Sequence, residues 1–147
     1  PNIVTSLELD PAEMEKRNIH LQQKYAEIEE KEVRYEEIHC DDAEYLIVAF
    51  GSCARIAQKA MEEARAEGIK VGLLRPITLW PFPSKAIAER SRQVKGILTV
   101  ELNAGQMVED VRLAVECKVP VEYFGRLGGI VPDPDEVVTA LKEKIIK

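Results

Sequence analysis

Short apolar runs alternate with segments of helical periodicity from residue 43 to the end of the chain. The apolar runs predict strands at residues 44–50, 69–74, 96–102 and 119–124. Capping residues, glycine stops and helical spacing predict helices at residues 53–67, 83–94, 106–115 and 133–146. The apolar runs show little polar alternation, so we expect the strands to be buried on both faces of a sheet. The pattern therefore predicts a three-layer α/β/α domain with a mostly parallel sheet.

The first part of the chain has a different pattern, and residues 10–37 predict one long charged helix. Asp10 is placed as its cap, with Pro11 in the first turn and Glu13 as the reciprocal acid. The apolar positions are sparse and form a narrow stripe of Met14, Leu21, Tyr25 and Ile28. Such a helix is either a solvated surface helix or a connector against another domain or subunit. Residues 33–40 also fit a short edge strand in place of the last helical turn.

Composition and charge narrow the classes of protein. The chain has 147 residues, of which 46% are apolar and 31% charged, as in a soluble globular domain. No apolar run approaches the roughly 20 residues of a membrane helix, and no signal segment begins the chain, so we expect a cytoplasmic protein with no membrane partner. The first residue is Pro1, which suggests a processed or truncated chain. A net charge of −6 argues against a nucleic-acid partner.

The cysteines and histidines predict no metal or cofactor site in this chain. Cys40, Cys53 and Cys117 have no CxxC spacing, so reduced thiols are expected and a four-cysteine zinc or iron–sulfur site is excluded. The two histidines are too few and too far apart for a metal cage. Cys53 stands in a first helical turn, but no nearby base supports a nucleophile, so a structural thiol is expected there.

Ligands of open α/β sheets bind beyond the carboxyl ends of the strands, and four predicted loops lie at that edge. Gly51 and Ser52 begin the first of these helices. They could hold an anion on backbone N–H groups, but a plain turn in which Ser52 caps the helix is the favoured interpretation. Neither GxGxxG nor GxxxxGK[ST] is present. The second loop follows Leu74, and the fourth is GRLGG, in which Arg126 either contacts a phosphate or carboxylate or lies in an exposed turn.

The third loop, ELNAGQ, places Glu101, Asn103 and Gln106 at the end of a strand. These groups could bind a ligand, form hydrogen bonds across an interface, or make a local turn network. No paired carboxylates, catalytic triad, metal ligands or phosphate loop rise above background. The domain therefore does not look catalytic by itself.

The stretch LLRPITLWPFP is unusual because its loop carries large aromatic side chains between prolines. Prolines lower the entropy cost of ordering a loop, and exposed aromatics are typical of docking surfaces. The other interpretation is a loop folded over its own core. The residues that we expect to dock are Arg75, Thr78, Trp80, Phe82, Glu101, Asn103 and Gln106.

The segments AFGSCARIAQKA, EGIKVGLLRPITLWPFP, ILTVELNAGQMVEDVRLAV and VEYFGRLGGIVPDPDEV resemble the 2-oxoacid:ferredoxin oxidoreductases. The resemblance covers about residues 43–147 and is to the domain after the pyrimidine-binding domain of their alpha-type subunit. The segment KRNIHLQQKYAEIEE resembles that family's interdomain linker, so residues 1–42 would be a linker helix and first edge strand. The layout is also similar to the C-terminal domain of transketolase-like enzymes.

The resemblance implies a five-stranded mixed sheet of order 1-3-2-4-5 whose first strand is antiparallel. It implies a complex that decarboxylates a 2-oxoacid, gives the acyl group to coenzyme A and passes electrons to ferredoxin. Thiamine diphosphate, magnesium and iron–sulfur clusters would lie in other parts of that complex, since this chain has no GDG signature. The implied partners are thiamine-binding and ferredoxin-like subunits and the preceding pyrimidine-binding domain. No catalytic role is carried over to any residue.

The sequence is closer to the 2-oxoisovalerate members of the family, with the 2-oxoglutarate members next. Two alternatives stay open. One is the equivalent domain of a ferredoxin-independent thiamine enzyme. The other is a stand-alone module that binds a nucleotide or anion at the crevice near Gly51 and Asn103.

Overall fold

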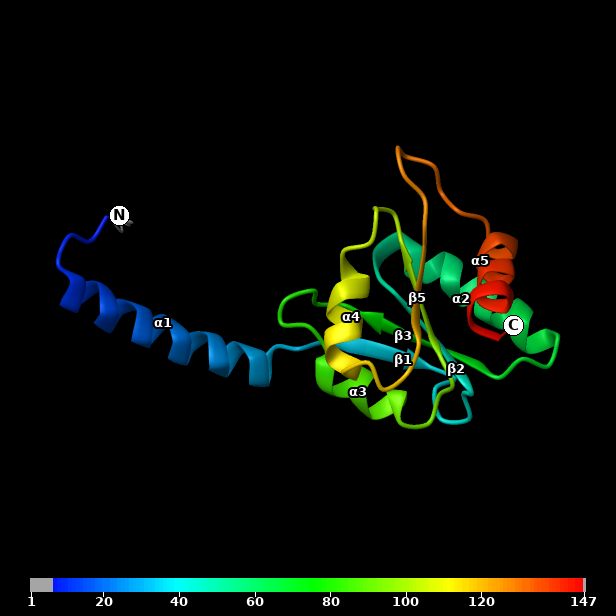
Figure 1. Ribbon diagram of the computed structural model, residues 1–147, viewed down its shortest axis with the longest axis horizontal. Helices are drawn as coiled ribbons and strands as arrows, with labels where there is room; N and C mark the ends of the chain where they lie inside the picture. The colour runs from blue at the N-terminus through cyan, green and yellow to red at the C-terminus, as the bar shows by residue number, and fades with distance from the viewer. Residues whose placement is uncertain (1–6, 147) are drawn as a thin grey trace.

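The computed structural model describes residues 7–146, and its centre is one mixed sheet of five strands in the order β1-β3-β2-β4-β5 (Figure 1). The strands are β1 Tyr35–Ile38, β2 Tyr45–Ala49, β3 Val71–Pro76, β4 Ile97–Glu101 and β5 Val121–Gly125. β1 is antiparallel to β3, and the other neighbouring pairs are parallel. This topology confirms the strand order and direction that the resemblance implied.

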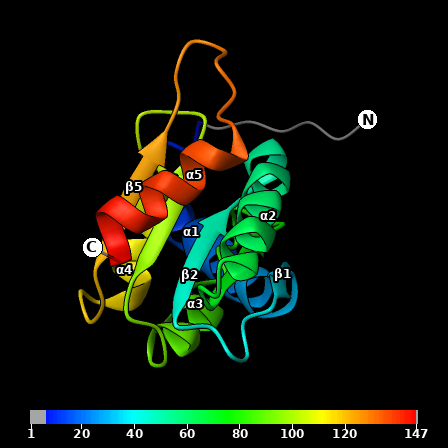
Figure 2. The same ribbon diagram turned by 90° about the vertical axis from the view of Figure 1, so that its right-hand side faces the viewer.

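Helices cover both faces of the sheet and so complete the expected three layers. They are α1 Pro11–Lys31, α2 Gly51–Ala66, α3 Ser84–Ser91, α4 Met107–Val115 and α5 Pro134–Leu141, which continues as a π-helix, Lys142–Ile146. In Figure 1, α3 and α4 lie on one side of the sheet, and α2 and α5 lie on the other. Figure 2 shows the second side, with α2 and α5 in front of the strands.

The alternation of side chains along the strands divides the core into two clusters. Ile47, Leu73 and Leu98 face α2 and α5, and their neighbours Leu46 and Leu74 face α3 and α4. All five side chains are fully buried, as expected of strands covered on both faces. On the first face α2 presents alanines, which let the helix approach the sheet closely; these are Ala54, Ala57, Ala60 and Ala64.

α1 differs from the other helices because none of its residues is buried. It extends from the body of the molecule, with its first turn farthest from the sheet (Figure 1). The side chain of Asp10 accepts hydrogen bonds from the backbone of Ala12 and Glu13, which confirms the predicted cap.

The expected extension of this helix to residue 37 is wrong, because α1 ends at Lys31. The backbone carbonyl of Arg34 accepts hydrogen bonds from the N–H groups of Ile77 and Thr78, and the Arg34 N–H donates to the Thr78 hydroxyl. Pairing with a distant loop therefore overrides the helical pattern. The alternative of a short edge strand is the correct one, and it forms β1.

Ser52 was expected to cap the next helix, and this expectation is also wrong. α2 begins at Gly51, two residues before the predicted start at Cys53, and its N-cap is Phe50, without a side-chain hydrogen bond. Gly51 has φ +57°, a left-handed conformation that glycine adopts readily, so the chain turns before Ser52 is reached. The cap predicted at Asp133 is present, and Glu136 completes the reciprocal pair.

Candidate functional site

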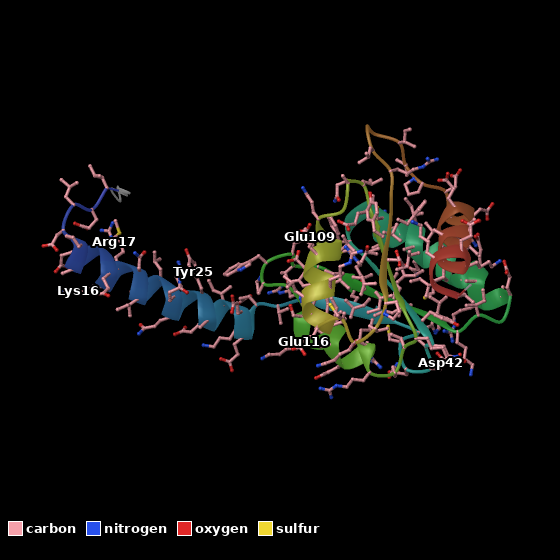
Figure 3. All side chains as sticks on the ribbon, in the orientation of Figure 1. Lys16, Arg17, Tyr25, Asp42, Glu109 and Glu116 are labelled. Atoms are coloured by element: carbon pink, nitrogen blue, oxygen red, sulfur yellow. The ribbon has the colours of Figure 1, made fainter. Side chains whose placement is uncertain are left out.

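The loop between β3 and α3 carries the largest aromatic side chain of the chain on its outer surface. Trp80 is 55% exposed, and Ile77 and Leu79 are 48% and 49% exposed. The Trp80 ring meets the ring of Tyr25 edge-on, with centroids 5.7 Å apart and planes at 84°. Tyr25, labelled in Figure 3, comes from the projecting helix α1. No sequence pattern predicted this pair, although Tyr25 lies on the apolar stripe of the helix.

Hydrogen bonds hold the shape of this loop from inside. The hydroxyl of Thr78 donates to the carbonyl of Pro81 at 2.8 Å and accepts from the N–H of Arg34 at 2.9 Å. The peptide bond between Trp80 and Pro81 is cis. Thr78 thus joins the loop to the segment that follows α1, and its side chain serves the loop's own geometry.

The two aromatics of the loop have different environments. Phe82 is half-buried and packs against the core cluster under α3 and α4, and its neighbours Pro81 and Pro83 are buried. Trp80 faces outward. The interpretation of a loop folded over its own core therefore describes Phe82, whereas a docking role for Trp80 stays a prediction.

Arg75 stands at the end of β3 and pairs across the sheet with β1. Its Nη1 donates to the carboxylate of Glu36 at 2.8 Å, and about half of each side chain is exposed. An ion pair so exposed contributes at most about 1 kcal/mol. Its Nε is buried and has no hydrogen-bond partner among residues 7–146. Arg75 therefore helps to hold β1 against β3 through Nη1, whereas its Nε–H makes no hydrogen bond among the described residues.

Glu101, at the end of β4, is fully buried. Its carboxylate accepts hydrogen bonds from the backbone N–H groups of Met107 at 2.8 Å, Val108 at 3.0 Å and Gln106 at 3.2 Å. These are the free N–H groups that begin α4, which has no cap from its own N-cap side chain. A buried carboxylate from the neighbouring strand therefore occupies the position where an external anion would bind.

The rest of this loop is also held locally. The side-chain oxygen of Asn103 accepts from the N–H groups of Gly105 at 2.8 Å and Gln106 at 3.1 Å. The hydroxyl of Tyr123 on β5 donates to the Asn103 carbonyl. Of the three interpretations of the ELNAGQ loop, a local turn network is what the structure shows for Glu101 and Asn103. The side chain of Gln106 is exposed.

Two groups near Glu101 have raised pKa values. Burial, and next the carboxylate of Glu101, raise the pKa of the Cys53 thiol. The same two causes raise the pKa of the Tyr123 hydroxyl. Cys53 is buried, as the sequence predicted, and its purely structural role stays a prediction.

The remaining candidates lie apart from the aromatic loop. Gly51 and Ser52 are exposed at the exit of β2, which neighbours β4, so they share the sheet edge with the Glu101 loop. Arg126, just after β5, donates to the carboxylate of Glu136 at 2.5 Å and so ties its loop to the cap of α5. The candidates therefore form two groups, one around Trp80 and one around Glu101, with Arg126 engaged within the fold.

Neither a metal-binding cluster nor a membrane-spanning helix occurs within residues 7–146. No group of three or more histidine, cysteine, aspartate or glutamate side chains in this range could hold a metal ion. No helix within the same range has the length and apolar character to span a membrane.

The sheet order and the antiparallel first strand define a mixed-sheet α/β domain. Its fold matches a 2-oxoglutarate:ferredoxin oxidoreductase from Magnetococcus marinus, solved with 2-oxoglutarate, coenzyme A and succinyl-CoA, at a TM-score of 0.79 and 24% identity over 92% of this chain and 24% of that one. It also matches a split-gene transketolase, at a TM-score of 0.65 and 22% identity over 75% of this chain and 40% of that one.

The sequence comparison identifies the family. The chain belongs to the pyruvate:ferredoxin oxidoreductase core domain II family, whose model matches residues 43–137. It is 51% identical over 142 residues to the ketoisovalerate oxidoreductase subunit VorB of Methanothermobacter thermautotrophicus, covering 97% of this chain and 40% of VorB. It is 33% identical over 101 residues to the 2-oxoglutarate synthase subunit KorA of Methanothermobacter marburgensis, covering 69% of this chain and 27% of KorA. The chain thus spans about two fifths of the length of VorB and a smaller share of KorA.

Proposed function

We propose that this chain is an assembly domain of a 2-oxoacid:ferredoxin oxidoreductase subunit and takes no direct part in the chemistry. The observation that carries the proposal is Trp80, a large aromatic held outward on a loop that Thr78 and buried prolines fix in place. A rigid, exposed aromatic loses little conformational entropy when it is covered, so it suits a docking surface. The carboxylate of Glu101 already satisfies the N–H groups that would receive an anion, which counts against a stand-alone nucleotide-binding module. Membership of the ferredoxin-linked family favours this reading over a ferredoxin-independent enzyme.

The substrate of the whole complex is proposed to be 2-oxoisovalerate. The support is the 51% identity to a ketoisovalerate oxidoreductase subunit, against 33% to a 2-oxoglutarate synthase subunit. The complex would convert the oxoacid and coenzyme A to an acyl-CoA and carbon dioxide, with electrons passed to ferredoxin. Thiamine diphosphate with magnesium would supply the carbanion chemistry and iron–sulfur clusters the electron path, and both are assigned here to other domains and subunits.

The division of the chain is part of the same proposal. Residues 1–42 would be the linker and first edge strand, and residues 43–147 the assembly domain. The linker would lead from a pyrimidine-binding domain, and the partners would be thiamine-binding and ferredoxin-like subunits in the cytoplasm. The exposed helix α1, which contributes no residue to the core, supports a connecting role.

Replacing Trp80 tests the docking role. In the complete subunit, Trp80→Ala is expected to weaken the affinity for the partner subunits by tenfold or more, about 1.4 kcal/mol. Because the side chain is 55% exposed, the free energy of unfolding should change by less than about 1 kcal/mol. Leu113→Ala is the matched control, since Leu113 is an apolar residue on α4 that is 76% exposed. Size-exclusion chromatography and titration calorimetry measure assembly, and urea unfolding measures stability. Unchanged assembly with a large loss of stability would make the loop intramolecular and end the proposal.

A further inference from the structure

A groove of about 680 Å³ opens where α1 joins the rest of the chain. One wall is formed by Ala26, Glu29 and Glu30, which lie on one face of α1 at helical spacing, and by Val33 just after the helix. The opposite wall is residues 80–83 of the aromatic loop, followed by the first turns of α3. The groove is therefore shaped jointly by the projecting helix and by the loop to which a docking role is assigned.

Aromatic and proline side chains make up the apolar surface of this groove. Trp80 is 55% exposed and Tyr35 is 41% exposed, and both line it. Phe82 is half-buried at the same surface, between Pro81 and Pro83. Grooves lined with aromatic side chains are typical of surfaces that bind extended peptide segments.

The rim of the groove is acidic. Glu29, Glu30 and Glu89 line it with exposed side chains, and Lys85 is the one basic residue among the described residues that do so. None of the three glutamates has an ion-pair partner within residues 7–146. Carboxylates beside an aromatic face attract a guanidinium or ammonium group through both ion pairing and the ring quadrupole. The acidic rim and the aromatic surface thus both favour binding of an arginine or lysine side chain.

We propose that the groove receives an extended basic segment of a partner subunit, with an arginine or lysine side chain placed between Trp80 and the glutamates of α1. This inference rests on the proposed assembly function and specifies the chemistry of the partner. A second copy of this chain is the less favoured occupant, because the chain carries a net charge of −6 and would bring further acid to an acidic rim.

Charge reversal on one wall tests the inference in the complete subunit. Glu29→Lys combined with Glu30→Lys should weaken binding of the purified partner subunits by tenfold or more at about 0.1 M salt. The difference from wild type should shrink at about 1 M salt, where the Debye length falls from about 10 to about 3 Å. Both residues lie in the last turns of α1, where lysines favour the helix dipole, so helix loss would not explain weaker binding. Glu62→Lys combined with Glu143→Lys is the control, since it makes the same charge change at exposed sites that do not line the groove.

A photo-crosslinking amino acid placed at Ser84, an exposed residue on the groove wall, identifies the occupant in the assembled complex. The expected product joins Ser84 to a partner segment that contains arginine or lysine. Crosslinks to a neutral or acidic segment, or to a second copy of this chain, would overturn the inference. Equal binding by the charge-reversed variant and its control would also overturn it. If Trp80→Ala still weakens assembly in that case, the assembly function stands and only the basic occupant is wrong.

Discussion

The buried carboxylate of Glu101 should be among the most sensitive groups of the domain. Glu101→Ala leaves the N–H groups of Met107 and Val108 without acceptors in a buried setting. A buried donor left unpaired costs about 1–3 kcal/mol, and losing the negative charge at a helix N-terminus adds about 0.3–1 kcal/mol. With two donors unpaired, the expected loss in free energy of unfolding is therefore about 2–7 kcal/mol. Glu101→Gln keeps one acceptor oxygen but turns an amide donor toward the helix, so a loss of about 2–3 kcal/mol is expected.

Urea unfolding followed by far-ultraviolet circular dichroism measures both variants, since the exposed Trp80 is a poor reporter of the core. Glu109→Gln is the matched control, because Glu109 is an exposed acid in the first turn of the same helix and should lose only the dipole contribution. Amide hydrogen exchange at Met107 and Val108 should accelerate in the Glu101 variants and not in the control. If Glu101→Gln stays within about 0.5 kcal/mol of wild type, the carboxylate does not cap α4 in solution.

Two further perturbations test other contacts. Arg90→Ala removes a two-pronged ion pair from α3 to Glu37 at 2.9 and 2.6 Å and a contact with Asp41 at 3.0 Å, so a loss of about 1–2 kcal/mol is expected in urea unfolding, with only partial recovery by lysine. An alanine variant as stable as wild type would refute this. Burial, followed by the charge of Glu37, raises the pKa of the Cys40 thiol from 9.0 to about 11. The unfolded chain therefore loses this proton first, and the stability that depends on Cys40 should fall as pH rises from 9 to 11, by up to about 3 kcal/mol. Folded protein should accordingly alkylate at the exposed Cys117 well before Cys40, as peptide mapping would show, and equal rates would contradict the burial.

The central strands could be predicted from the sequence because strands that are buried on both faces consist mainly of apolar residues. Leu46, Leu74 and Leu98 lie in uninterrupted apolar runs, and such runs have few other uses in a protein of this size. The sequence pattern of β1 is a weaker strand signal. Its burial comes only at Ile38, and its place is set by bonds to the distant Thr78 and by the pair of Arg75 with Glu36. Contacts across about 40 residues of sequence have no periodicity that a local pattern could show.

The sequence predicted which residues lie in the candidate site but not the direction in which their side chains point. The sequence placed polar groups at the end of β4, and they are there, yet the turn directs the Glu101 carboxylate back onto α4 and away from the crevice. Ser52 failed as a cap for the same reason, since one left-handed glycine shifted the start of the helix. The aromatic loop was recognised from its composition, whereas its contact with Tyr25 depended on where α1 ends.

The projecting helix has a mechanical consequence. α1 has 21 residues, so at about 1.5 Å per residue it is a rod about 30 Å long. Near its base, the carbonyl of Arg34 accepts hydrogen bonds from the N–H groups of Ile77 and Thr78 in the aromatic loop, and the ring of Tyr25 contacts that of Trp80. A rotation of about 5° at that base would displace the far end by about 3 Å, on the order of one residue of strand length. The contacts with the aromatic loop therefore set the direction of α1, and a small change in the loop is amplified along the length of the helix.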